Sequence, residues 1–142
     1  WFIASAVPSL STLIQTSRKV NLNKTKWVFE QIKIKVKQLE KKYKKKIKVG
    51  CLGMSFKPNI DDLRESPALE IIKKLVAENF SIMVCEPNLD SHNDMKLFTL
   101  KEIFQKVDLI VFLVSHDQFK NLDLSKKEYL DFCGITNLKK NL

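Results

Sequence analysis

The sequence predicts an α/β fold in which a long N-terminal helix precedes a Rossmann-like parallel sheet with flanking helices. The segment from Pro8 to about Tyr43 carries a helical pattern longer than a small domain needs. From residue 46 onward, apolar runs of strand length alternate with amphipathic runs of helix length. Strand–helix–strand units of this kind form parallel sheets with right-handed crossovers, so the order of the runs predicts a parallel sheet.

The first element is a long helix, expected from Pro8 to about Tyr43. Pro followed by Ser is a typical start signal. Apolar and small residues recur with a period close to 3.6, as on one face of a helix. These residues are Leu10, Leu13, Ile14, Ser17, Val20, Trp27, Val28, Ile32, Val36 and Leu39. A helix of this length would expose a large apolar stripe unless a partner covered it, and such stripes mark interfaces. We therefore expect a homodimer with contacts at Leu10, Leu13, Val20, Trp27 and Ile32.

Four strands and two further helices are expected after the long helix. The strands are 47–54, 80–85, 107–114 and 129–132, and the helices are 68–78 and 99–106. Thr99, with Glu102 three residues later, forms a capping-box pattern. Ser66 followed by Pro67 is a typical helix start. The run 107–114 is almost entirely apolar, as expected for a strand with both faces covered.

The bulk composition is that of a globular protein. The chain has 142 residues, of which 44% are hydrophobic and 29% charged, enough for one domain and its core. No apolar run approaches the length of a membrane span. The first residues lack an initiator Met and the basic start of a signal peptide, so we expect this chain to be part of a longer protein.

The cysteines and histidines indicate neither a disulfide framework nor a metal site. Cys51, Cys85 and Cys133 are odd in number and show no CxxC spacing. Reduced thiols fit a cytoplasmic protein best, and we expect the first two to be buried in strands. The two histidines, His92 and His116, lie far apart in the sequence, so no metal is expected.

The net charge of +9 allows two interpretations. The lysines can form an ordinary solvated surface. They can also attract an anionic partner, such as nucleotide phosphate, nucleic acid or a membrane surface.

A long polar loop from Gly53 to Pro67 joins the first strand to the next helix. Open α/β sheets bind ligands outside the carboxyl ends of their strands, which is where this loop lies. The loop lacks the G-x-G-x-x-G turn that brings backbone N–H groups to a pyrophosphate, so we do not expect this chain alone to hold NAD. Glu86, after the second strand, stands where a ribose-binding acid would stand. Without the glycine turn, we expect it to be a surface or capping acid.

Two cations in the loop are candidates for anion binding. Lys57 lies just past the strand end, and we expect its ammonium to point into the crevice above the sheet. Arg64 lies beside a helix N-terminus, a region favourable to anions, and its planar fork suits bidentate contacts. Alternatively, Arg64 forms a salt-bridge cluster with Asp61, Asp62 and Glu65 that only shapes the loop. The residues by themselves favour neither interpretation.

Three segments carry a resemblance to a known family. The run 56–68, FKPNIDDLRESPA, resembles the nucleotide-sugar-binding C-terminal domain of the UDP-glucose/GDP-mannose dehydrogenase family. The run 17–21, SRKVN, resembles the Ala-Arg-x-x-Asn pattern of that family's central helix. The run 114–120, VSHDQFK, resembles the segment after the third strand of the same domain.

The resemblance implies a part of an NAD-dependent enzyme of polysaccharide biosynthesis. Such enzymes oxidise the primary alcohol of a nucleotide sugar to a carboxylate in two steps. It implies that Phe56 and Lys57 contact the UDP-sugar and that Arg64 reaches NAD, held mainly by an N-terminal domain. It also implies a central dimerisation or linker helix at 1–45 and a UDP-binding domain at 46–142. The family's catalytic cysteine, catalytic lysine and glycine fingerprint lie upstream of this range, so we expect no catalytic residue here and no activity from this chain alone.

One departure from the family and two other functions stay open. The family often carries a basic residue soon after an aspartate near the last strand, whereas Asp131 is followed by Phe132-Cys133-Gly134. The identity of the sugar is therefore open. The chain could instead be a structural dimerisation module or a basic nucleic-acid-binding module. Nucleic-acid-binding modules interleave aromatic and basic residues, and only Tyr43 does so in the lysine-rich stretch, so no nucleic-acid partner is expected.

Overall fold

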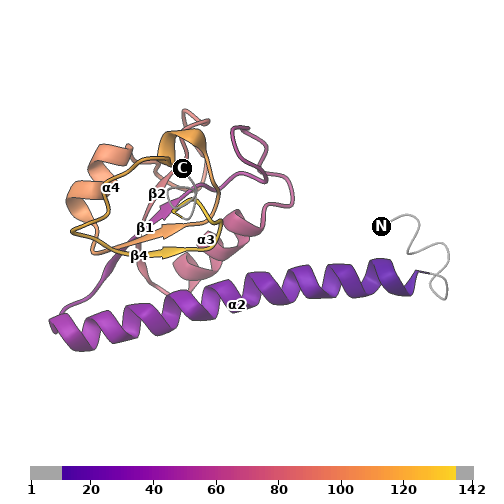
Figure 1. Ribbon diagram of the computed structural model, residues 1–142, viewed down its shortest axis with the longest axis horizontal. Helices are drawn as coiled ribbons and strands as arrows, with labels where there is room; N and C mark the ends of the chain where they lie inside the picture. Colours follow the sequence, from indigo (N-terminus) through magenta and orange to yellow (C-terminus); the bar gives the residue numbers. More distant parts are fainter. Residues whose placement is uncertain (1–10, 137–142) are drawn as a thin grey trace.

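The computed structural model describes residues 11–136. Helix α2 (Thr12–Tyr43) is followed by β1 (Lys48–Leu52), α3 (Pro67–Ala77), β2 (Ser81–Cys85), α4 (Leu100–Lys106), β3 (Leu109–Phe112), the 3-10 turn η2 (Asp117–Phe119) and β4 (Glu128–Asp131). Figure 1 shows α2 running beneath the sheet and projecting beyond it. The predicted fold class, a long N-terminal helix followed by a Rossmann-like parallel sheet, is confirmed.

The four strands form one parallel sheet in the order β2-β1-β3-β4. Strand β1 lies in the middle, where Gly50 pairs with Met83 of β2 on one side and with Ile110 of β3 on the other. The carboxyl ends of parallel strands meet at one edge of a sheet. The segments that follow β1, β2 and β3 are therefore neighbours at that edge.

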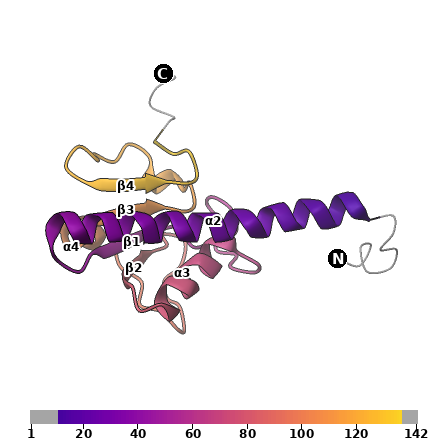
Figure 2. The same ribbon diagram turned by 90° about the horizontal axis from the view of Figure 1, so that it is seen from below.

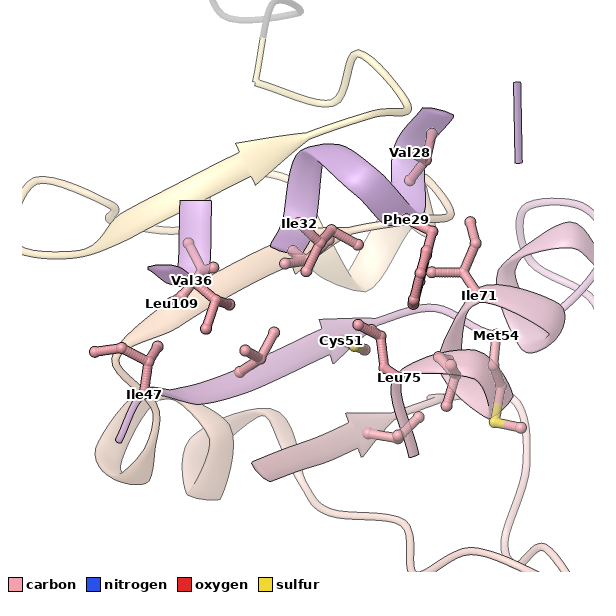
Figure 3. Close-up of a cluster of buried hydrophobic side chains, with 14 of the residues drawn as sticks. Val28, Phe29, Ile32, Val36, Ile47, Cys51, Met54, Ile71, Leu75 and Leu109 are labelled. Atoms are coloured by element: carbon pink, nitrogen blue, oxygen red, sulfur yellow. The ribbon is translucent and has the colours of Figure 1, made fainter. Parts of the chain in front are cut away.

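Helices α2 and α3 cover one face of the sheet, and α4 covers the other together with Phe119. Figure 3 shows the first face, where side chains of α2 meet side chains of the sheet and of α3. Ile32 is fully buried in this cluster. Its predicted role as a contact with a second copy is therefore wrong, because the apolar stripe of α2 turns onto the protein's own sheet at this point.

The amino-terminal half of α2 extends past the sheet into solvent (Figures 1 and 2). Leu13 is 82% exposed, Val20 59% and Trp27 47%, so these three predicted contact residues are accessible. Leu10 and the predicted helix start at Pro8 lie outside the described residues. Helix α2 begins at Thr12 and ends at Tyr43, where the sequence predicts its end.

An ion-pair cluster joins the carboxyl-terminal half of α2 to the edge strand β4. The carboxylate of Glu128 accepts from Lys35 at 2.8 Å and from Lys42 at 3.0 Å. Hydrogen bonds from these two ammonium groups lower the pKa of Glu128 to about 2. The cluster keeps this part of the helix against the sheet.

Two local predictions, the capping box of α4 and the buried cysteines of the first two strands, are also confirmed. The side chains of Thr99 and Glu102 form the capping box of α4. Cys51 and Cys85 are buried free thiols in β1 and β2. Within residues 11–136, no helix combines the length and apolar composition needed to span a bilayer. The same part of the chain holds no cluster of three or more side chains suited to bind a metal ion.

Candidate functional site

The candidate site is the loop from residue 53 to residue 66, which begins where β1 ends. Gly53 starts the loop with a φ of 87° and donates its N–H to the carbonyl of Cys85 at 2.9 Å. A Cβ atom at this position would lie 2.5 Å from the Cβ atom of Val114. Both the left-handed backbone conformation and the close approach of Val114, which lies just past the end of β3, therefore require glycine here.

A buried carboxylate binds the first turn of the loop. Oε2 of Glu86 accepts the N–H of Met54 at 2.8 Å and that of Ser55 at 3.1 Å, and Oε1 accepts the N–H of Asn88. Burial acts to raise the pKa of Glu86, but the hydrogen bonds from His116, Met54 and Asn88 outweigh it and hold that pKa below its usual value. The sequence predicts that Glu86 is a surface or capping acid. The surface position is wrong, because the residue turns inward. It does cap backbone groups, since it accepts the N–H groups of Met54 and Ser55 just past the end of β1.

His116, also fully buried, completes the binding of the loop. Its Nε2 lies 3.0 Å from Oε2 of Glu86, and its Nδ1 lies 2.9 Å from the backbone nitrogen of Asn59 and 3.0 Å from Nδ2 of Asn88. A backbone N–H can only donate, so Nδ1 is the acceptor and the ring proton lies on Nε2. Sequence reasoning missed this contact between His116 and the loop.

Further hydrogen bonds join the loop to η2 and close it on itself. Asn59, with a φ of 61°, donates through Nδ2 to Asp117 at 2.9 Å and accepts the N–H of Asp117 at 2.9 Å. The N–H of Phe56 donates to the carbonyl of Asp62 at 2.8 Å. The segment between residues 56 and 62 is therefore a closed turn with defined ends.

Ser66 joins the end of the loop to its beginning and to helix α3. Its Oγ accepts the N–H of Leu69 at 3.2 Å, which makes it the N-cap of α3 as predicted, and Pro67 is the first helical residue. The same hydroxyl donates to the carbonyl of Met54 at 2.8 Å. One side chain thus caps the helix and fixes where the loop returns to the sheet.

Phe56 lies in a groove between the loop and helix α2. The groove has a volume of about 680 Å³, and Arg18 and Asn21 of α2 line it together with Phe56. The segments 17–21 and 56–68, which are far apart in the sequence, therefore line one groove. Phe56 itself is 46% exposed.

Lys57 and Arg64, the two predicted anion-binding residues, lie outside the lining of this groove. Lys57 is exposed, and its ammonium lies 5.6 Å from the ring centroid of Phe56. Within residues 11–136 it makes no ion pair with a carboxylate. Its charge is therefore available to an anionic ligand.

Arg64 is held by one acid of the predicted cluster. Its Nε and Nη2 donate to the two oxygens of Asp62 at 2.9 Å and 2.8 Å, while the arginine side chain stays 89% exposed. The hydrogen bond from Arg64 lowers the pKa of Asp62 to about 2. Asp62 thus orients an exposed guanidinium. Glu65 lines the groove instead, with a φ of 53°.

Asp131 organises the turn after β4 that departs from the family pattern. Its Oδ1 accepts the N–H of Gly134 at 2.8 Å and that of Cys133 at 3.1 Å. Its Oδ2 accepts both the N–H and the hydroxyl of Thr136, at 2.8 Å and 2.7 Å. The aspartate therefore closes the turn through local hydrogen bonds.

Residues 50–134 match the family model described as "UDP-glucose/GDP-mannose dehydrogenase family, UDP binding domain". The chain is 39% identical to UDP-N-acetyl-D-mannosamine dehydrogenase of Campylobacter jejuni, over 94% of this chain and 33% of that protein. It is 35% identical to NDP-N-acetyl-D-galactosaminuronic acid dehydrogenase of Ralstonia nicotianae, over 99% of this chain and 34% of that protein.

Among solved structures, the fold matches UDP-N-acetyl-mannosamine dehydrogenase of Staphylococcus aureus with a TM-score of 0.71 and 25% identity, over 89% of this chain and 35% of that chain. The chain thus spans about a third of the length of the curated relatives it matches. The match to the family model contains the entire loop from 53 to 66.

Proposed function

Because the chain belongs to the UDP-glucose/GDP-mannose dehydrogenase family, we propose that it is the UDP-sugar-binding part of an NAD-dependent nucleotide-sugar dehydrogenase. The observation that carries the proposal is the match of residues 50–134 to the family's UDP binding domain. The names of the relatives favour UDP-N-acetyl-D-mannosamine as the substrate, with UDP-N-acetylmannosaminuronate as the product. A nucleoside-diphosphate derivative of N-acetylgalactosamine is the alternative substrate.

The geometry of the loop supports distinct roles for its residues. Phe56 offers an aromatic face in the groove, and Lys57 offers an exposed ammonium near that ring. We assign both residues to the UDP-sugar, with Lys57 binding its phosphates through charge-assisted hydrogen bonds.

Arg64 fits a contact with NAD, because its guanidinium is exposed and already oriented by Asp62. NAD, when bound, would supply the hydride acceptor for this oxidation. No glycine-rich turn of the kind that holds a pyrophosphate follows β1 in the described residues. We therefore assign most of the NAD site to the other part of the protein, and a single supporting contact to Arg64.

Enzyme assay of the full-length protein that contains this chain tests the proposed function. NADH is expected to form with UDP-N-acetylmannosamine, and more slowly with UDP-N-acetylgalactosamine and UDP-glucose. The change in absorbance at the NADH band measures it. Absence of NADH formation with every UDP-sugar would overturn the proposal.

Replacing Arg64 by alanine is expected to raise the KM for NAD about fivefold and to change the KM for the UDP-sugar much less. An exposed ionic contact contributes up to about 1 kcal/mol, which corresponds to this factor. Arg64→Lys should restore little, because an ammonium does not reproduce the planar fork. Initial rates measured with each substrate varied in turn provide both constants. A larger effect on the sugar than on NAD contradicts the assignment.

We also propose that the projecting half of α2 forms a homodimer with a second copy, with residues 1–45 as the dimerisation or linker helix and 46–142 as the UDP-binding domain. Leu13 and Val20 are exposed apolar residues on this half. Leu13→Glu and Val20→Glu together should convert the dimer to a monomer in sedimentation experiments. Ile34→Glu, at an exposed position where α2 lies along the sheet, is the control. A folded monomer of the unmodified protein at high concentration would count against this interface.

Two further assignments belong to the proposal. We propose no nucleic-acid partner, which is supported by the pairing of Lys42 with Glu128 and of Lys45 with Asp108 at the basic end of α2. We also propose a cytoplasmic location, which is supported by free thiols at all three cysteines.

A further inference from the structure

We infer that Glu86 and His116 are positioning residues for nucleotide-sugar binding. Together they bind three backbone N–H groups of the loop and thereby hold Phe56 and Lys57 where the ligand meets them. This inference rests on the proposed function, because it assumes that the loop binds the nucleotide sugar. Neither residue touches the ligand in this proposal.

The sheet order explains why these two residues reach the loop. Glu86 follows β2, and His116 lies just after β3, while the loop follows β1. Because β2 and β3 flank β1 on its two sides, the two residues approach the start of the loop from opposite sides. Both side chains are fully buried, and Nε2 of His116 lies 3.0 Å from Oε2 of Glu86.

The pair binds the N–H groups on either side of the ligand-binding residues. Glu86 accepts from Met54 and Ser55, and His116 accepts from Asn59. Residues 56 and 57 lie between these two anchored points. A shift at either point must therefore displace Phe56 and Lys57 relative to the groove.

Only one protonation arrangement satisfies every donor at this centre. Glu86 must be ionised, because Oε2 accepts two backbone N–H groups and faces Nε2 of His116. The ring proton of His116 must lie on Nε2, because Nδ1 faces the N–H of Asn59 and the amide nitrogen of Asn88. A second ring proton on Nδ1 would point at two donors. The hydrogen bonds therefore require an ionised carboxylate at position 86 and an imidazole with its proton on Nε2 at position 116, which packing alone would not require.

Three substitutions test the contacts of Glu86 and of the two ring nitrogens of His116 one at a time. Glu86→Gln replaces one acceptor oxygen by an NH₂ group, which then faces a donor. His116→Gln offers an amide N–H near Glu86 but no acceptor for Asn59. His116→Asn offers an acceptor near the position of Nδ1 but no donor for Glu86. Ile103→Val, a conservative change in the fully buried core under α4, is the control for lost stability alone.

Amide hydrogen exchange and UDP titration of the full-length protein provide the readouts, with the melting temperature alongside. His116→Gln should speed exchange mainly at Asn59, and His116→Asn mainly at Met54 and Ser55. Glu86→Gln should speed exchange at Met54 and Ser55 and weaken UDP binding roughly tenfold, the loss expected for a displaced charge-assisted contact. Ile103→Val should lower the melting temperature and leave both readouts unchanged.

The inference is overturned if the Glu86 and His116 variants bind UDP as tightly as Ile103→Val does, or if their exchange increases equally along β1 and the loop. If the unmodified protein does not bind UDP, the proposed function fails. The exchange pattern at Met54, Ser55 and Asn59 then still decides whether the pair holds the loop, since that readout needs no ligand.

Discussion

Replacing Gly53 by alanine is expected to lower the free energy of unfolding by several kcal/mol, the largest effect of any single methyl group added to the loop. The φ of 87° at this residue is strained for alanine, at a cost of roughly 1–3 kcal/mol. The added Cβ would also lie 2.5 Å from Cβ of Val114 and 3.0 Å from its backbone nitrogen. Relieving that overlap requires backbone movement, which costs another ~1–3 kcal/mol.

Gly134→Ala is a matched control for this substitution. Gly134 has a φ of 78°, but no atom of residues 11–136 lies within 4 Å of the position of its Cβ atom. It should therefore show the backbone cost without the overlap. Urea unfolding of both variants measures the difference. Equal loss of stability in the two variants would contradict the close packing between the start of the loop and the end of β3.

Replacing Lys57 by alanine is expected to weaken UDP-sugar binding tenfold to a hundredfold and to leave NAD affinity nearly intact. A hydrogen bond to a charged group contributes about 1.5–3 kcal/mol, which corresponds to this range. The exposed ammonium makes no ion pair within the described part of the chain, so its removal disturbs no carboxylate. Calorimetric titration of the full-length protein with each ligand measures both affinities.

Lys41→Ala serves as the control for loss of a positive charge. Lys41 is exposed in the last turn of α2. That turn leads into the amino end of β1, whereas the loop follows the carboxyl end of the same strand. Its removal should change neither affinity by more than the experimental error. Losses of equal size for UDP-sugar and NAD in Lys57→Ala, in proportion to a lowered melting temperature, would show that the lysine only shapes the loop.

The elements of the fold could be predicted because their signals are local. The capping box of Thr99 and Glu102 and the N-cap Ser66 each lie within three residues of the helix N–H groups that they cap. The apolar runs gave the four strands to within a few residues of their ends. Their alternation with helices gave the parallel sheet, because few topologies satisfy that order.

The parts that could not be predicted depend on how distant segments meet. The period of α2 places Ile14 and Ile32 on one side of the helix, but only the position of the sheet decides that Ile32 is buried and Ile14 exposed. The groove between Arg18 and Phe56 also depends on distant segments, because it forms where α2 lies beside the loop. A periodic pattern describes a face of a helix, and it does not say which length of that face is covered.

The burial of Glu86 could not be predicted either, because it also depends on a segment that is distant in the sequence. An acid followed by proline after a buried strand looks like a surface residue in the sequence. Its burial follows from the neighbouring loop, whose N–H groups at Met54 and Ser55 need an acceptor. The signal available in the sequence was its position: Glu86 and His116 each follow a strand that adjoins β1.

Titration of the full-length protein with UDP, followed by amide hydrogen exchange at each residue, tests whether this loop is the nucleotide-binding site. We expect saturable binding and slower exchange concentrated in residues 53–66, with little change at the amino ends of the strands. Saturable binding that slows exchange elsewhere and leaves residues 53–66 unchanged would contradict the assignment of the loop.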